Sequence, residues 1–250
     1  MKRGLFFTLE GIDGSGKGTQ FERLKAYLAA AGKDLLCLRE PGGTAIGEKI
    51  RQLLLERENE TMTAETELLL FAAARAQNTA ENILPALEAG RWVLCDRFFD
   101  STLAYQAGGR GLDREPVRQS ILLATGGLEP DLTFYFDLSP EEADARRRAR
   151  EAESGGRADR IEAEDLSFDR RVREEYLRLA DAYPRIRVID ASLPPEAVWE
   201  QVKTILDKFL QNRLSGSGEM IRGPQRRAAD RGEAGHDRSG NRKDQSFTYI

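Results

Sequence analysis

The sequence predicts an α/β fold in which a five-stranded parallel sheet is flanked by helices on both faces. Three observations lead to this prediction. Five short apolar runs, each typical of a strand buried on both faces, alternate along the chain with longer amphipathic segments. A glycine-rich turn at residues 11–19 joins the first run to the first helical segment. Such alternation is the pattern of parallel sheets, because their crossover connections are usually helices.

The individual elements follow from apolar periodicity and from residues that begin or end helices. Strands are expected at Leu5–Leu9, Asp34–Leu38, Trp92–Cys95, Leu132–Asp137 and Arg187–Ile189. Helices are expected at Lys17–Ala31, Ala45–Leu55, Ala64 to about Ala89 with a break near Pro85, Asp113–Ala124, Pro140 to about Ala152, Phe168–Ala182 and Pro195–Leu210. Gly32 is expected to end the first helix, and Ser139 to cap the helix at Pro140.

Composition indicates one domain at residues 1–210 and a polar tail at residues 211–250. The chain has 250 residues, of which 40% are hydrophobic, enough for a sizeable core. The tail has too few apolar residues to offset the entropy lost on ordering, so it is expected to be disordered. The net charge of −4 provides no basic footprint for nucleic acid over the whole chain.

The cysteines indicate the cellular compartment, and the single histidine limits the kinds of catalysis to expect. Cys37 and Cys95 lie in strand-like runs, and no signal peptide or membrane-length apolar stretch precedes them. Two core thiols in a cytoplasmic protein explain this better than a redox pair does. His236, the single histidine, lies in the tail, so histidine-based catalysis and a zinc site are not expected.

The glycine-rich turn has the composition of a phosphate cradle. Glycines let consecutive backbone N–H groups turn toward an anion, and the helix that follows adds its positive end. Lys17 supplies a mobile cation for the terminal phosphates. The predicted ATP-binding residues of this loop are Gly11, Ile12, Asp13, Gly14, Ser15, Gly16, Lys17, Gly18 and Thr19. The alternative is a glycine-rich turn that only joins strand to helix. Such a turn would not require a lysine at position 17.

A magnesium site is predicted beside this loop. Gly18 stands where a serine or threonine would offer a hydroxyl to Mg²⁺, so Thr19, one place on, or water is expected to fill that position. Asp96 leaves the third strand near Lys17 if the two strands are neighbours, and a carboxylate suits Mg²⁺ directly or through water. A helix N-cap is the alternative for Asp96.

Polar groups after the second and third strands form a candidate acceptor site. Ligands bind beyond the carboxyl ends of parallel strands, where Glu40, Pro41 and Arg97 occur. Pro41 restricts Glu40 to an extended backbone, and the peptide between them is a candidate for the cis form. Arg51 is a candidate anion ligand on the next helix. A tight turn and a solvated helix arginine are the alternatives.

Phe71 and Arg75 lie one turn apart on an apolar helix, so they share a face. An aromatic plate beside a bidentate donor suits a planar heterocycle with carbonyl edges. A core phenylalanine beside a surface arginine would give the same pattern. Tyr105 and Gln106 follow the third strand, before a turn expected at residues 108–111.

The charged segment at about residues 140–162 is a candidate lid. Arginines crowd its first half, and a glycine pair separates them from Asp159-Arg160-Ile161-Glu162. Closure of such a flap would bring arginines onto polyphosphate and exclude water. A solvated helix of alternating charge is the alternative. The pattern does not show which of Arg146, Arg148 and Arg150 faces inward.

Several of these motifs together resemble the thymidylate kinase family of the bacterial type. The resemblance rests on Glu10–Gln20, Arg39–Thr44, Phe71–Arg75, Asp96–Phe98, Ala104–Gln106 and Asp159–Glu162, in order from about Gly4 to Leu210. It implies a P-loop nucleoside monophosphate kinase fold with a mobile lid. It also implies phosphoryl transfer from ATP with Mg²⁺ to dTMP, and a homodimer.

The resemblance also implies roles for single residues. Asp13 would bind the sugar 3′-hydroxyl, Phe71 would stack on thymine, and Arg75 would donate to its O4 edge. Arg97 and Arg51 would hold the acceptor phosphate, Glu40 and Pro41 would close the sugar side, and Tyr105, beside Gln106, would exclude a 2′-hydroxyl. Because Gly14 replaces the P-loop arginine of some relatives, Arg146, Arg148 and Arg150 would act from the lid, with Arg150 at the transition state.

Catalysis would then use charge and alignment. The acceptor phosphate is already a nucleophile at neutral pH, so Lys17, Arg97, Asp96 and Arg150 would align groups and neutralise charge. Two alternatives remain open at this point. The chain could be a kinase for another nucleoside monophosphate, or a nucleotide-gated switch without turnover.

Overall fold

The computed structural model describes residues 3–155 and 158–214 and confirms the predicted α/β class. Its five-stranded sheet has the order β2-β3-β1-β4-β5, and all neighbouring strands are parallel. The strands are β1 (Phe6–Glu10), β2 (Leu35–Arg39), β3 (Trp92–Asp96), β4 (Leu132–Asp137) and β5 (Ile186–Asp190). Each predicted strand is present, with ends shifted by at most one residue.

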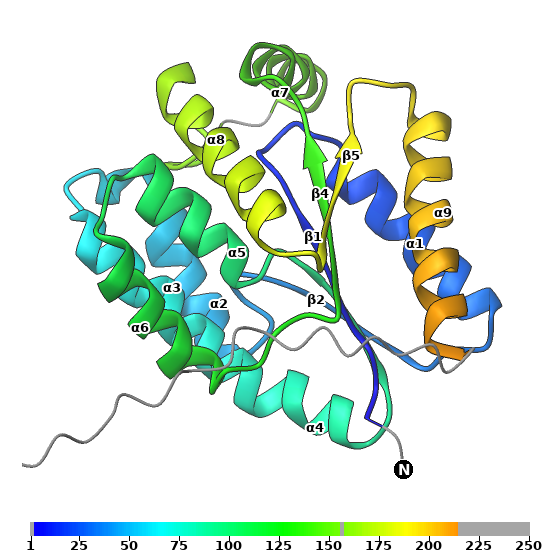
Figure 1. Ribbon diagram of the computed structural model, residues 1–250. Helices are drawn as coiled ribbons and strands as arrows, with labels where there is room; N and C mark the ends of the chain where they lie inside the picture. Colours follow the sequence, from blue (N-terminus) through cyan, green and yellow to red (C-terminus); the bar gives the residue numbers. More distant parts are fainter. Residues whose placement is uncertain (1–2, 156–157, 215–250) are drawn as a thin grey trace, which may run out of the picture. The chain divides into compact units, whose positions relative to one another are not determined.

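Helices cover both faces of this sheet (Figure 1). α1 and α9 lie on one side, and α2, α3, α6 and α8 lie on the other. The helices are α1 (Lys17–Ala30), α2 (Ala45–Leu55), α3 (Ala64–Asn78), α4 (Leu84–Glu88), α5 (Phe99–Thr102), α6 (Arg114–Thr125), α7 (Pro140–Ser154), α8 (Leu166–Ala182) and α9 (Pro195–Leu214). Ser139 caps α7 through a bond from the Glu142 amide, as predicted.

The structure confirms the break near Pro85 and corrects two other boundaries. The long helix from Ala64 breaks at a π-helical segment, Thr79–Ile83, before Pro85, which lies in the first turn of α4 where its missing N–H costs nothing. The turn expected from Gly108 begins later, because Leu103–Gly109 is also π-helical. α9 continues to Leu214, and residues 215–250 of the predicted tail lie outside the described residues.

Glycines explain why a π-helical segment extends to Gly109. A Cβ on Gly108 would lie 2.7 Å from the Glu175 Cβ, and one on Gly109 would lie 2.5 Å from the Phe168 ring. The two glycines therefore let the π-helical segment pack directly against α8. This packing turns the neighbouring Tyr105 and Gln106 into the interior, where both are buried.

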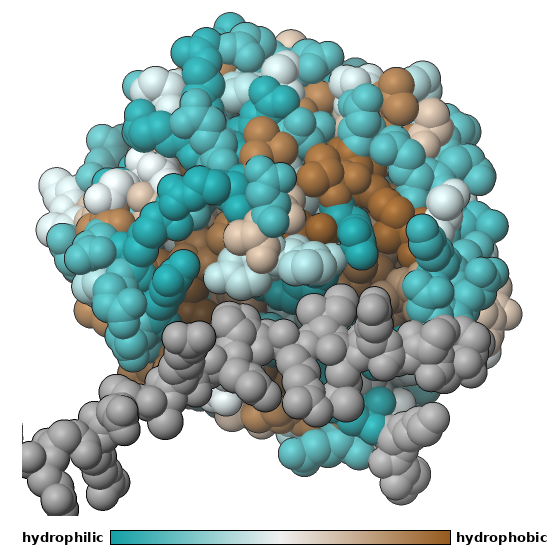
Figure 2. All heavy atoms as spheres, viewed as in Figure 1, coloured by the Kyte–Doolittle hydropathy of each residue, from teal (hydrophilic) through white to brown (hydrophobic). Residues whose placement is uncertain are grey.

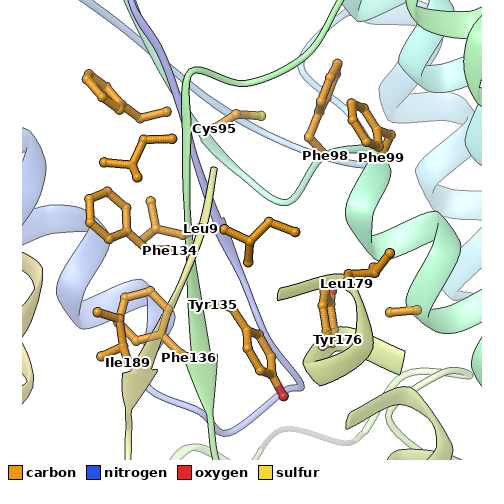
Figure 3. Packing of buried hydrophobic residues seen from close by; sticks show 14 of the residues in the cluster. Leu9, Cys95, Phe98, Phe99, Phe134, Tyr135, Phe136, Tyr176, Leu179 and Ile189 are labelled. Atoms are coloured by element: carbon orange, nitrogen blue, oxygen red, sulfur yellow. The ribbon is translucent and has the colours of Figure 1, made fainter. Parts of the chain in front are cut away.

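The core lies on both faces of β1, β3 and β4. Figure 3 shows Phe134, Phe136 and Ile189 on one side of these strands and Phe98, Tyr135 and Tyr176 on the other. Tyr135 and Tyr176 stack with ring centroids 4.7 Å apart, which fastens α8 to β4. None of the helices in the described residues is long and apolar enough to cross a membrane. Most of the surface visible in Figure 2 is hydrophilic, with hydrophobic residues concentrated in one central area.

Candidate active site

The candidate site lies at the carboxyl edge of the sheet, as the topology predicts. β1 lies between β3 and β4, so the loops that follow β1, β3 and β4 meet at one edge. The β1 loop is residues 11–16, Arg97 follows β3, and α7 follows β4. In register, Leu9 of β1 pairs with Asp96 of β3, which brings the glycine-rich loop and the β3 loop side by side.

The glycine-rich loop has the backbone conformation of an anion cradle. Gly11, Gly14 and Gly16 have φ angles of 146°, 91° and 84°, a region that side chains disfavour. Gly16 begins α1 without a side-chain cap, so the first amides of the helix point into the loop without a side-chain acceptor. The Lys17 ammonium donates to the Ile12 carbonyl at 3.1 Å, and burial lowers the pKa of Lys17.

Asp13 joins the loop to the β3 side of the site. Its Oδ1 accepts from Arg97 Nη2 at 2.9 Å and lies 3.9 Å from Lys17 Nζ. Burial opposes ionisation of this carboxyl, but the charges of Arg97 and Lys17 outweigh it and lower the pKa of Asp13 to about 2. Asp13 is therefore an anion at neutral pH. It lies between the cations of Arg97 and Lys17, which can also bind a phosphate ligand.

Arg97 is held in an unusual backbone conformation. Among residues 3–155 and 158–214 it is the non-glycine residue with positive φ, at 67°. Its amide donates to Leu9 O at 2.9 Å, and its guanidinium carbon lies 5.0 Å from the centre of the Tyr105 ring. This conformation turns the Arg97 side chain toward the acceptor pocket. Backbone strain of this kind in a non-glycine residue is often found at functional sites.

Glu40 and Arg75 form a buried ion pair across the pocket floor. Arg75 Nε donates to Glu40 Oε2 at 2.8 Å, and both side chains are 2% exposed. The other two nitrogens of Arg75 donate to Thr102 Oγ1 at 2.6 Å and to Phe98 O at 3.0 Å. The fork of Arg75 is thus fixed, with one hydrogen on each terminal nitrogen left for a ligand. The Glu40–Pro41 peptide is cis, the form the sequence allowed.

One pocket is lined by every residue predicted to bind the acceptor. These residues come from the glycine-rich loop, the β2 loop, α2, α3, the β3 loop and the π-helical segment Leu103–Gly109: Asp13, Glu40, Pro41, Arg51, Phe71, Arg75, Arg97, Tyr105 and Gln106. Leu55, Ser101, Thr102, Asp159 and Ile161 complete the lining. The pocket thus combines an aromatic side chain, an apolar wall and three arginines, a composition that suits a base joined to a phosphate.

Hydrogen bonds and ion pairs fix the side chains that line this pocket. Gln106 donates to Glu67 Oε1 at 2.9 Å, and Glu67 also pairs with Arg110 and Arg160. Arg51 donates to Pro41 O at 3.0 Å. The Tyr105 hydroxyl is buried and has no hydrogen-bond partner among the described residues, so it presents an unsatisfied polar atom beside the pocket.

The two residues predicted to bind Mg²⁺ come from neighbouring parts of the site: Asp96 ends β3, and Thr19 lies in α1, which follows the β1 loop. Asp96 Oδ1 is buried without a hydrogen-bond partner among the described residues, as is Ser15 Oγ. Thr19 is exposed on the first turn of α1. No group of three histidine, cysteine, aspartate or glutamate side chains in the described part of the chain forms a metal cage. A lone carboxylate suits Mg²⁺ that is mostly bound by phosphate and water.

The three lid arginines predicted to act on phosphate each contact a different partner within the protein. Arg146 donates to Ala191 O at 3.1 Å, Arg148 pairs with Asp144 at 2.9 Å, and Arg150 pairs with Glu162 at 2.9 Å. Arg148 and Arg150 are mostly exposed. The lid residues 156–157 lie outside the described residues.

Arg147 is the lid arginine that contacts the glycine-rich loop, and sequence reasoning passed it over. Its Nη1 donates to Asp13 O at 3.2 Å and to Asp169 Oδ2 at 2.9 Å. Glu10, Glu67 and Asp159 were also not assigned to the site. The sequence signal for Glu10 was a carboxylate at the end of a buried strand, whereas the sequence held no signal that separates Arg147 from the neighbouring arginines.

Comparison with known proteins gives a consistent result. The chain matches the protein-family model described as thymidylate kinase over residues 9–202, which contain every site residue named above. It is 48% identical over 210 residues to a protein named thymidylate kinase of Caldanaerobacter subterraneus subsp. tengcongensis, covering 84% of this chain and 98% of the relative. It is 49% identical over 211 residues to the thymidylate kinase of Pseudomonas savastanoi pv. phaseolicola, covering 84% and 98%. The thymidylate kinase of Desulfovibrio desulfuricans is 47% identical over 216 residues, covering 85% and 99%.

Proposed function

The chain belongs to the thymidylate kinase family, and we propose that it binds dTMP in the pocket lined by Asp13, Phe71 and Arg75. It is an enzyme that phosphorylates dTMP to dTDP, with ATP as the phosphoryl donor. The observation that carries the proposal is that one pocket collects all the residues predicted to bind the acceptor, from six separate parts of the chain. Such convergence is unlikely for residues with unrelated structural roles.

The acceptor binds with its base toward α3 and its phosphate toward the glycine-rich loop. Phe71 offers a flat face for thymine, and the two remaining hydrogens of Arg75 face a carbonyl edge. Arg97 and Arg51 hold the phosphate, and Asp13 accepts the 3′-hydroxyl. Tyr105 fills the space of a 2′-hydroxyl, which favours deoxyribose. Glu40 and Pro41 close the sugar side, with Gln106 beside the base.

ATP binds with its phosphates in the glycine-rich loop. The unsatisfied amides at the start of α1 receive the phosphate oxygens, and the Lys17 ammonium leaves Ile12 O to follow the transferred group. Arg146 and Arg148 belong to the donor side of the lid, and Arg150 releases Glu162 to reach the transferring phosphoryl group. The reaction needs no general base, because the acceptor phosphate is an anion at neutral pH.

The residues at this edge fit Mg²⁺. The unpartnered Asp96 carboxylate oxygen would hold the ion directly or through water, with Thr19 on the donor side. When bound, Mg²⁺ neutralises charge on the donor phosphates. The protein's own groups then supply alignment, through the fixed forks of Arg75 and Arg97, and exclusion of water, through the lid.

A panel of nucleoside monophosphates tests this function. ADP formation from ATP is measured with dTMP, dUMP, AMP and CMP, and we expect saturation with dTMP and a much lower kcat/KM for AMP and CMP. Preference for AMP would reject the roles of Phe71 and Arg75 and favour another monophosphate kinase. Tight ATP binding without turnover on any monophosphate would favour a nucleotide-gated switch.

A homodimer is also proposed, supported by exposed apolar residues on helices that pack side by side. α2, α3 and α6 are neighbours, and they carry Ile46, Leu53, Leu69, Leu122 and Leu123, the last 87% exposed. A second copy would cover these side chains. Analytical ultracentrifugation tests this: Leu123→Glu is expected to yield monomers, whereas Leu193→Glu, at an exposed site beyond β5, should leave the dimer intact. A monomeric wild-type protein would contradict it.

A cytoplasmic location is proposed as well. Both cysteines are free thiols, which a reducing compartment preserves. Fractionation of cells that express the chain tests this location, and recovery with membranes or in the medium would contradict it.

A further inference from the structure

Glu10, at the end of β1, is a fully buried carboxylate that the reaction described above does not use. Its exposed fraction is 0%, and it does not line the acceptor pocket. Oε1 accepts from the Phe98 amide at 2.7 Å, and Oε2 accepts from Ser101 Oγ at 2.5 Å and from the Tyr176 hydroxyl at 2.8 Å. A buried carboxylate is costly unless it is well bonded, so its retention needs a reason.

The donors of all three bonds lie next to Arg97. Phe98 follows Arg97 directly, and the Phe98 amide bond to Glu10 fixes the peptide that leaves the left-handed Arg97 backbone. Ser101 Oγ and the Tyr176 hydroxyl lie 3.3 and 3.5 Å from Arg97 Nη1. Figure 3 shows Tyr176 on α8, on the same side of the sheet as Phe98. Glu10 thus contacts the backbone and both hydroxyl neighbours of Arg97 without touching Arg97 itself.

The direction of these bonds matters. A hydroxyl has one proton, so when Ser101 and Tyr176 donate to Glu10, their oxygen lone pairs are left for the guanidinium of Arg97. A neutral amide in place of the carboxylate would donate to the hydroxyls and turn their protons toward Arg97. The charge of Glu10 therefore sets whether the pair accepts from Arg97 or opposes it.

We propose that Glu10 is a positioning residue that holds Arg97 in place for the acceptor phosphate, through Phe98, Ser101 and Tyr176. Arg97 is the group that touches substrate, and Glu10 acts through it. The inference rests on the proposed dTMP site. It predicts that Glu10 affects acceptor affinity specifically, and that its effect requires the Arg97 side chain.

A double-mutant cycle on dTMP binding tests the proposal. Kd values for dTMP and for ATP are measured by titration calorimetry at pH 8.5, above the Glu10 pKa of about 7, for the wild type, Glu10→Gln, Arg97→Ala and the double variant. Glu10→Gln is expected to raise the Kd for dTMP about tenfold or more, as for loss of hydrogen bonds to a charged group, and to leave the Kd for ATP within about twofold. In the Arg97→Ala background, Glu10→Gln should change the Kd for dTMP by less than about twofold.

Two further variants keep the test decisive. Tyr176→Phe retains the aromatic stack and removes one hydroxyl that donates to Glu10, so it should weaken dTMP binding severalfold even if Glu10→Gln does not fold. Asp131→Asn is the matched control, because Asp131 accepts from the Phe6 amide at 2.8 Å at the opposite end of β1. Its dTMP affinity should equal that of the wild type.

Two results would overturn the positioning role of Glu10, and a different result would overturn the proposed function. Equal losses of dTMP affinity from Glu10→Gln in the presence and absence of Arg97, or a lower melting temperature with an unchanged Kd, would overturn the positioning role. A wild-type protein that binds no dTMP would instead overturn the proposed function and leave this inference without its premise.

Discussion

Arg147 on α7 donates to the backbone oxygen of Asp13 in the glycine-rich loop, at 3.2 Å. The same guanidinium nitrogen donates to Asp169 Oδ2 on α8 at 2.9 Å, and the Arg147 side chain is buried. One side chain therefore joins the base of the lid to the loop that binds phosphate and to the helix behind it.

Removal of this arginine should destabilise the protein strongly. Arg147→Met would leave Asp169 buried without its partner, which typically costs about 3–5 kcal/mol of unfolding free energy. The double variant Arg147→Met/Asp169→Leu removes both charges and should recover more than half of that loss. Urea denaturation measures both values. If the double variant is as unstable as the single one, the buried pair is not the reason for the loss.

Gly14 fixes the second point of contact between the glycine-rich loop and α7. Its φ is 91°, and a Cβ there would lie 2.4 Å from Ala143 O. Gly14→Ala should therefore lower the unfolding free energy by about 2 kcal/mol or more, since both strain and overlap oppose it. Gly18→Ala is the control, because no atom lies within 4 Å of its Cβ, and Ala should stabilise α1 by up to about 1 kcal/mol. Thermal melts that order the two variants the other way would contradict this account.

The fold and the acceptor pocket could be predicted from sequence because both depend on local signals. Apolar runs placed the strands to within one residue, and parallel strands bring the residues that follow them to one edge. Glu40, Asp96 and Arg97 were found for this reason. The Phe71–Arg75 spacing placed both side chains in one pocket, because residues four apart share a helix face.

Contacts between distant elements could not be predicted in the same way. Arg147, rather than a neighbouring arginine, contacts the loop because α7 packs on Gly14 through Ala143, one turn before Arg147. The role of Glu10 depends on Tyr176, which is 166 residues away on α8. No periodicity in the sequence specifies either relationship, since each depends on how a helix packs against β1 or the loop that follows it.

Lys17 and Phe71 should separate the donor from the acceptor side in steady-state kinetics. Lys17→Ala removes the cation that follows the transferred phosphoryl group, so kcat should fall about a hundredfold or more with a small change in the KM for dTMP. Phe71→Ala removes the stacking face and should raise the KM for dTMP about tenfold or more, with kcat changed less. Arg75→Ala should also raise the dTMP requirement, but it leaves Glu40 buried without its ion pair and so affects folding too. Equal effects of Lys17→Ala and Phe71→Ala on both parameters would refute the two assignments.

Arg150 should act in turnover rather than in ground-state binding. Arg150→Ala should lower kcat about a thousandfold, the scale of a supplied arginine in phosphoryl transfer, with the dTMP and ATP affinities nearly unchanged. Arg170→Ala is the control, because Arg170 on α8 is similarly exposed and pairs with Glu141 on α7. Rapid-quench measurement of the chemical step distinguishes the two. A normal rate for Arg150→Ala would transfer the role to another lid arginine.

The titration of Glu10 should make folding stability fall as the pH rises toward neutrality. Burial, together with the nearby Asp100 carboxylate, raises the pKa of Glu10 from 4.5 to about 7, although bonds from Ser101 and Phe98 and the charge of Arg97 act in the opposite direction. Between these two pH values the unfolded chain has lost the Glu10 proton and the folded chain keeps it. The folded state therefore binds more protons, and its unfolding free energy declines across this interval.

The size of this decline can be measured against a variant that does not titrate. A shift of this extent corresponds to roughly 3 kcal/mol between the two ends of the interval, and no further change is due to Glu10 above the folded-state pKa. In Glu10→Gln the decline should be smaller by that amount. Asp13 does not contribute to it, because its pKa is lowered from 3.8 to about 2 and its titration therefore ends below pH 4.5. Urea denaturation of both proteins from pH 4.5 to 8 measures the difference. Parallel curves would show that Glu10 is ionised throughout, held so by its three hydrogen bonds.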